Sequence, residues 1–284
     1  MFAAAFFVVA FALQTPAPAP AQSPTDPKQV ETAVAELTAA FGKEGTPQKR
    51  VEAIQKHVGV VDARVIEWVA KGLVDSEGTV VTASVDALGH MKHPNALESL
   101  SSWFKREKKK LADDETLLPQ VFKAIGRHGS PSSVELLSKD PFDQRTYLAA
   151  QARVMSLGNI RAKEALEALI DMSKLVGPHR MDGVRNDFRV ALAQLTGLDL
   201  GPASTAWQKW WQDNKKTFEV AKEPAKLEGI LQRQWQRYWG LGEKGEKAKE
   251  GEGGGEGGRK RRGGEGKGGD GRGGGDKGGE GGGG

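Results

Sequence analysis

Three stretches of this chain share one spacing of apolar residues, and this shared register most constrains what the chain can fold into. Each stretch contains a glycine, and Gly89, Gly126 and Gly158 lie 37 and 32 residues apart. The eighth residues after these glycines are Leu97, Val134 and Leu166, and the eleventh are Leu100, Leu137 and Leu169. Apolar residues recur at spacings of three and four, the period of a helix with one buried face. The stretches are therefore predicted to be copies of one helical hairpin.

Each hairpin is expected to turn at its glycine, because glycine readily adopts the left-handed conformation that ends a helix. Pro94 and Pro131 follow in two of the turns, and proline suits the first turn of a helix, where no amide partner is lost. One hairpin cannot bury its own apolar face, so neighbouring copies must stack. The predicted fold is all-α, an α-solenoid of stacked helical hairpins. A less regular copy is expected in residues 51–73, and a further unit in residues 187–218.

Two motifs carry a resemblance to a known family. Ala-Leu-Gly, a short turn and Ala-Leu-Glu-x-Leu, clearest in residues 87–100 and 156–169, resembles HEAT repeats of the short bacterial kind, which also occur in phycobilisome-lyase-like proteins. Leu-Thr-Gly at 195–197 and Trp-x-x-Trp-Trp at 207–211 are similar to the end of many exported bacterial HEAT-repeat proteins. The resemblance covers residues 80–218. It implies protein–protein interaction along a concave surface and supplies no catalytic residue.

The first residues resemble a secretory signal peptide. Residues 2–13 form an uncharged apolar run of 12, followed by the small-x-small site Ala19-Pro20-Ala21. Such a run is too short to span a bilayer as a helix, which takes roughly 20 apolar residues. Cleavage after Ala21 is expected, with the mature chain secreted or periplasmic. An uncleaved anchor is the alternative.

The last residues have a very different composition. Of the chain's 38 glycines, 24 lie between Gly240 and Gly284, and residues 243–284 carry 10 basic and 9 acidic side chains. Such a segment cannot bury a core, so a disordered, mixed-charge tail is predicted. The predicted organisation is a signal peptide (1–21), a Pro/Ala-rich linker with a first helix (22–45), a HEAT-like α-solenoid with Trp-rich capping helices (46–239) and the tail (240–284).

Two basic runs are the candidate partner-binding segments. With 41 Lys and Arg against 37 Asp and Glu, the whole chain is too balanced for a bulk polyanion binder. The candidate residues are Lys105, Arg106, Lys108, Lys109 and Lys110 in the body, and Arg259, Lys260, Arg261 and Arg262 in the tail. Binding of a nucleic acid or an anionic surface is the alternative to solvated charge. Interleaved acids and the lack of aromatic residues in the tail argue against nucleic acid.

Two aromatic segments close the predicted body. Trp207, Trp210, Trp211 and Phe218 are expected on one face of one helix, as the buried seam of the last repeat or as a binding platform. Residues 227–239 are expected to form an amphipathic helix. It is predicted to be a terminal cap on the solenoid, and an anionic membrane surface is the alternative partner.

No metal, cofactor or catalytic site is predicted. The chain has no cysteine. His90 and His93 share one turn and His128 lies in the equivalent turn of the next copy, but a metal site needs three or four supported ligands. Nucleophile-elbow, phosphate-loop and dinucleotide motifs do not occur in the sequence. The predicted function is a non-catalytic protein-binding scaffold acting outside the cytoplasm. A lyase-like enzyme is an alternative by analogy of fold only.

Overall fold

The computed structural model of the protein describes residues 26–142, 146–176 and 182–241. Within these ranges the chain forms twelve α-helices, two 3-10 helices and no strand. The helices are α1 (Pro27–Ala40), α2 (Pro47–Lys56), α3 (Ala63–Lys71), η1 (Gly72–Val74), α4 (Gly78–His90), α5 (Pro94–Leu111), α6 (Leu117–Arg127), η2 (Pro131–Ser133), α7 (Val134–Ser138), α8 (Tyr147–Gly158), α9 (Lys163–Lys174), α10 (Asp182–Thr196), α11 (Ser204–Asn214) and α12 (Gly229–Trp239). The prediction of an all-α fold is confirmed.

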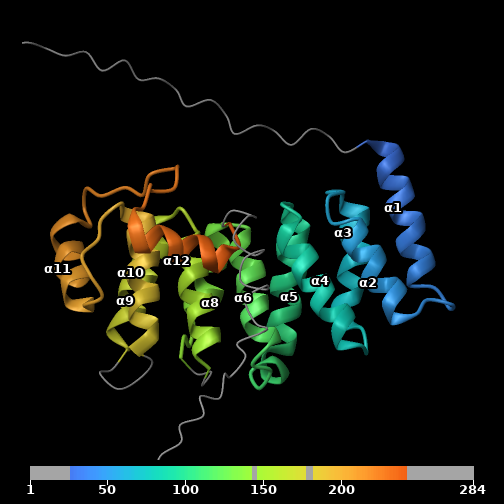
Figure 1. Ribbon diagram of the computed structural model, residues 1–284, viewed down its shortest axis with the longest axis horizontal. Helices are drawn as coiled ribbons and strands as arrows, with labels where there is room; N and C mark the ends of the chain where they lie inside the picture. Colours follow the sequence, from blue (N-terminus) through green and yellow to red (C-terminus); the bar gives the residue numbers. More distant parts are fainter. Residues whose placement is uncertain (1–25, 143–145, 177–181, 242–284) are drawn as a thin grey trace, which may run out of the picture. The chain divides into compact units, whose positions relative to one another are not determined.

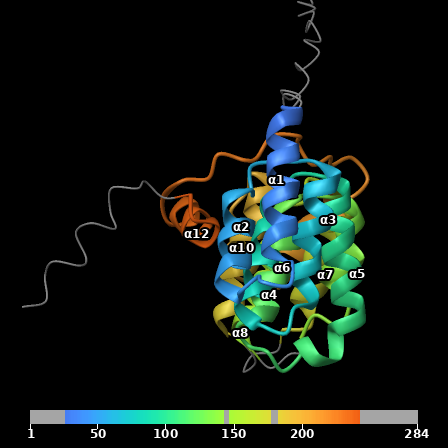
Figure 2. The same ribbon diagram turned by 90° about the vertical axis from the view of Figure 1, so that its right-hand side faces the viewer.

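The helices pack as two sets within the unit that ends at Leu241 (Figure 1). In the first set, α2, α4, α6, α8 and α10 each contact the next. In the second set, α1 contacts α3, α3 contacts α5, α7 contacts α9 and α9 contacts α11. Figure 2 shows α3, α5 and α7 on one side and α2, α8 and α10 on the other. Each predicted hairpin therefore contributes one helix to each set.

The repeated leucines anchor the second set of helices. Leu100 on α5, Leu137 on α7 and Leu169 on α9 are each fully buried in the main apolar core. Leu166 is also buried, whereas Leu97 and Val134 are half-buried and pack against that core. The shared register thus corresponds to equivalent core positions in α5, α7 and α9.

The glycines of the three copies differ from the prediction in their conformation. Gly89 and Gly126 lie inside α4 and α6, and Gly158 is the last residue of α8. None of these three glycines has a positive φ. Gly197, the residue directly after the end of α10, has a φ of 74°. The expectation that a left-handed glycine ends each first helix was therefore wrong for these positions.

Close approach of neighbouring helices explains these glycines instead. A Cβ on Gly89 would lie 2.8 Å from the Cα of Ala124, and a Cβ on Gly126 would lie 2.7 Å from the Cα of Ser156. A Cβ on Gly158 would lie 2.8 Å from the Cα of Ala191. Each glycine thus lets one helix of the first set contact the backbone of the next, since no side chain separates them.

The aromatic seam is buried only in part and extends past one helix. Trp207 and Trp211 are buried on α11, and the indole of Trp207 donates to the Gly201 carbonyl at 2.8 Å. Trp210 is half-buried and packs edge-on against Phe218 with ring centroids 5.0 Å apart. Phe218 lies after the end of α11, so the expectation that all four rings share one helix was wrong.

The helix predicted for residues 227–239 is α12, which begins at Gly229. Leu231 and Trp235 are buried against Met155, Val190 and Ala193 of α8 and α10. Figure 2 shows α12 outside the first set of helices, and α11 is the last helix of the second set. The buried apolar residues of α12 thus cover the side of the first set, whereas Ile230 of the same helix is 53% exposed.

Two predicted segments lie outside the described residues. These are the signal peptide (1–21) and, beyond Leu241, the predicted disordered tail with its basic segment Arg259, Lys260, Arg261 and Arg262. Among the residues that the structure does describe, none of the helices is both long enough and apolar enough to cross a bilayer.

Candidate functional site

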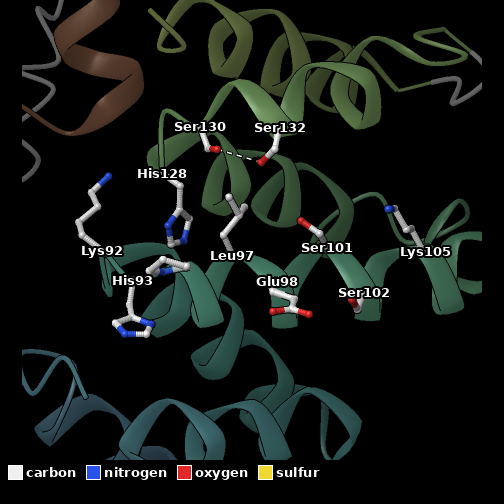
Figure 3. A pocket seen from close by; sticks show the side chains of 11 residues that line it. Lys92, His93, Leu97, Glu98, Ser101, Ser102, Lys105, His128, Ser130 and Ser132 are labelled. Atoms are coloured by element: carbon white, nitrogen blue, oxygen red, sulfur yellow. Dashed lines mark hydrogen bonds between the residues drawn. The ribbon is translucent and has the colours of Figure 1, made fainter. Parts of the chain in front are cut away.

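A groove between α5 and the η2–α7 segment is the candidate functional site. It consists of two cavities of about 650 and 300 Å³, which share Ser101, Lys105 and Ser132 in their linings. Because both cavities have these three residues in common, we treat them as one continuous surface and call it the α5–α7 groove. Figure 3 shows the larger cavity, with side chains from α5 below and from the η2 segment above.

The groove exists because α7 is too short to cover α5. In the α6–α7 hairpin the second helix, α7, has only 5 residues, whereas α5 has 18. Pro131 starts the short η2 turn before α7, and Pro141 follows soon after it. α7 ends at Ser138, and Lys139 directly after it is extended, with a φ of −71° and a ψ of 129°. The side of α5 that a longer α7 would contact is left open.

Hydroxyl groups line both walls of the larger cavity. Ser101 and Ser102 lie on α5, and Ser130 and Ser132 lie on the opposite wall (Figure 3). The hydroxyls of Ser130 and Ser132 are 2.9 Å apart and hydrogen-bond to each other. A hydroxyl both donates and accepts, so these walls can satisfy either kind of polar group on a ligand.

Cationic side chains outnumber carboxylates in the groove. Its linings include five cations and two acids, namely Lys92, Lys105, Lys108, Lys139, Arg153, Glu98 and Glu135. Lys108 is 3.2 Å from Asp140 in an ion pair at the rim. Lys92 donates to the main-chain carbonyl of Arg127, and burial together with the charge of Arg127 lowers the pKa of Lys92. The net charge of the lining attracts anions.

The predicted basic run of the body divides between the groove and open solvent. Lys105 and Lys108 line the groove, and Lys110 lines a separate cavity on the far side of α5 beside Asp114. Arg106 and Lys109 are exposed on α5. The sequence therefore did not distinguish which cations of this run share a cavity.

Arg153 is a groove residue that the sequence analysis missed. Its side chain is 1% exposed, and its guanidinium lies 4.2 Å from the centroid of the Phe122 ring. One terminal nitrogen donates to the carbonyls of Leu136, Leu137 and Lys139, at 3.3, 2.8 and 3.0 Å. Arg153 thus satisfies the carbonyl end of α7 and fixes one wall of the groove. An arginine among the apolar residues of 149–157 was the available signal.

The histidines near the groove are engaged locally. The His93 ring accepts from the Asn95 amide at 3.1 Å and caps α5. His128 Nε2 lies 3.0 Å from the Leu88 carbonyl, and burial lowers the pKa of His128 to about 4. His90 lies 3.7 Å from Asp86, and burial also lowers its pKa. Among the described residues, no three His, Cys, Asp or Glu side chains gather as metal ligands do.

The lining of the larger cavity brings serine hydroxyls and two histidine rings together. In the described part of the chain, neither His93 nor His128 hydrogen-bonds to a groove serine, although that contact would activate a serine nucleophile. Neither a protein family model nor a curated protein sequence matches this chain. The groove's shape, hydroxyls and charge therefore supply the argument for function.

Proposed function

We propose that the chain is a non-catalytic scaffold that binds a partner protein through the α5–α7 groove. The observation that carries this proposal is the groove itself, where side chains from two successive hairpins converge on cavities of about 650 and 300 Å³. The lining offers hydroxyl, ammonium and carboxylate groups. Such a mixed polar surface on rigid helices can hold a partner in a fixed orientation.

We further propose that the hairpins form an α-solenoid of the HEAT type. Three hairpins, α4–α5, α6–α7 and α8–α9, bury leucines at the same offset from their glycines. The close contacts at Gly89, Gly126 and Gly158 repeat along α4, α6, α8 and α10. Repeating contacts between neighbours are what a stacked array requires.

Site-specific photocrosslinking in intact cells tests the binding function. A photoreactive phenylalanine analogue would replace Ser101 or Ser132 in the groove, and Lys109 on the exposed side of α5 as the control. Both groove positions are expected to crosslink the same protein, through one contact segment identified by mass spectrometry. Equal crosslinking from Lys109, or none from the groove, would contradict the proposal.

We also propose that the chain acts outside the cytoplasm, on the basis of its N-terminal apolar run and the small-x-small site that ends at Ala21. Sequencing of the N-terminus from an envelope or secreted fraction is expected to begin at Gln22. Recovery of the full-length chain in the cytoplasmic fraction alone would refute this location.

Polyanion binding is a second candidate, favoured by the position of Lys105, Lys108 and Lys139 around the smaller cavity. Counterion release predicts retention on heparin that falls steeply as salt rises. Deleting residues 242–284 and neutralising Lys105 and Lys139 should then abolish retention. Unchanged retention after both changes would exclude this candidate.

A further inference from the structure

We propose that the occupant of the α5–α7 groove is an extended, acidic peptide segment of the partner. This inference rests on the proposed binding function and names the chemistry of the ligand. Three features of the groove support it: its charge, its mixture of donors and acceptors, and its length.

The charge of the groove favours carboxylates. Lys105 and Lys139 lie on opposite walls of the smaller cavity, on α5 and directly after α7. Neither lysine has an ion-pair partner within the described ranges. Lys108 shares its charge with Asp140. An acidic side chain between Lys105 and Lys139 would therefore meet two unpaired ammonium groups.

The mixture of donors and acceptors favours a peptide over a nucleic acid. A peptide backbone presents both N–H donors and C=O acceptors. Lysines and serines can donate to its carbonyls, while Glu98, Glu135 and serine hydroxyls can accept from its amides. A phosphodiester backbone presents acceptors, and the two carboxylates would repel it. Phe104, the one Phe, Tyr or Trp side chain among the described residues of the lining, is 4% exposed and offers no face for base stacking.

The length of the groove fits a short extended segment. The lining follows α5 from Pro94 in the larger cavity to Lys108 in the smaller one. This stretch of helix rises about 21 Å at about 1.5 Å per residue. An extended chain covers that distance in about six residues, at about 3.3 Å per residue. Alternate side chains of such a segment would face the same wall.

The test uses fluorescence anisotropy with the full chain and four labelled probes. These are an octapeptide of alternating Glu and Ser, the same peptide with Gln for Glu, the same peptide with Lys for Glu, and a single-stranded oligonucleotide. The Glu peptide is expected to bind, with affinity that falls as salt rises. The Gln and Lys peptides are expected to bind at least about tenfold more weakly.

A matched pair of double variants locates the binding. Lys105→Gln with Lys139→Gln removes two charges from the groove, and Arg106→Gln with Lys109→Gln removes two charges from the exposed side of α5. The first pair of substitutions is expected to weaken binding of the Glu peptide about tenfold. The second pair is expected to weaken it less than about twofold. Circular dichroism of each variant checks that the helices are retained.

Three outcomes would overturn the acidic-peptide inference. The first is that both double variants weaken binding of the Glu peptide equally. The second is equal binding of the Glu and Gln peptides, and the third is tighter binding of the oligonucleotide than of the Glu peptide. Each leaves the binding function intact if Ser101 and Ser132 still crosslink one partner protein. A crosslinked contact segment without Asp or Glu would likewise reject the inference alone, whereas absent crosslinks would reject the binding function.

Discussion

The Nζ of Lys123, on α6, donates to the main-chain carbonyl of Tyr238, on α12, at 2.6 Å. The two residues are 115 positions apart, and the ammonium also lies 4.8 Å from the centroid of the Tyr238 ring. The bond satisfies a carbonyl in the last turn of α12, where a cation interacts favourably with the helix dipole. Lys123 therefore holds the end of α12 against the first set of helices.

Replacing Lys123 with Met should loosen α12 while leaving the main core intact. Loss of the charge-assisted bond and of the contact with the ring is expected to cost about 1–2 kcal/mol. Hydrogen exchange should accelerate in α12 but not in α8 or α10. Arg233→Met, at an exposed position of α12, is the control and should leave exchange unchanged. Equal acceleration in both variants would show that Lys123 does not hold the helix.

Gly126→Ala should destabilise the protein, although alanine normally favours a helix. Its Cβ would lie 2.2 Å from the Ser156 side chain and 2.7 Å from the Ser156 Cα, so α6 and α8 would have to separate. Overpacking of this kind typically costs about 1–3 kcal/mol. Urea unfolding followed by circular dichroism measures the loss.

Gly78→Ala is the matched control, because a Cβ there meets no atom within 4 Å and Gly78 also lies in a helix. The control should leave the protein equally stable or raise its stability by up to about 1 kcal/mol. Stabilisation by Gly126→Ala as well would rule out the close approach of α6 and α8.

The helices and their core positions could be predicted because their signals are local. Leu100, Leu137 and Leu169 are buried at the same offset because each hairpin repeats the same period of apolar residues. The role of Gly126 was misjudged because left-handed conformation and close helix approach both select glycine. The absence of a positive φ at Gly126 and its contact with Ser156, from the next hairpin, distinguish the two.

The groove could not be predicted, because it depends on a difference between neighbouring hairpins. Lys105 and Lys139 are 34 positions apart in the sequence and share a cavity only because α7 ends after 5 residues. The period of the apolar residues does not show how much of α5 the short helix α7 leaves uncovered. Arg153 likewise acts on carbonyls 14 to 17 positions away.

Arg153→Met should unfold α7 and remove one wall of the groove. Three carbonyls at the end of α7 would lose their donor in a buried place, which is expected to cost about 2–4 kcal/mol. Hydrogen exchange in residues 134–139 should accelerate more than in α9. The exposed Arg106→Met is the control and should stay within about 0.5 kcal/mol of the parent chain. Unchanged exchange in α7 would mean that Arg153 does not support it.

Stability should also depend on pH through His128. Because burial lowers the pKa of His128 from 6.5 to about 4, the unfolded chain binds more protons than the folded chain between these values. The contribution of His128 to the free energy of unfolding is therefore fully retained above about pH 6.5 and is lost progressively as the pH falls toward 4. After a discount for partial exposure, the loss is expected to be about 1 kcal/mol. Urea midpoints at a series of pH values measure it.

The variant His128→Gln separates this effect from other titrating groups. Glutamine keeps a donor for the Leu88 carbonyl but does not titrate, so the decrease in stability between pH 6.5 and 4 should become shallower. His90, whose pKa is also lowered, should account for part of what remains. Glu36 and Asp199 have pKa values lowered by hydrogen bonds to Lys56 and Arg189, so their contributions are lost only below about pH 4.5. An unchanged slope above pH 4.5 in His128→Gln would show that His128 titrates normally in the folded protein.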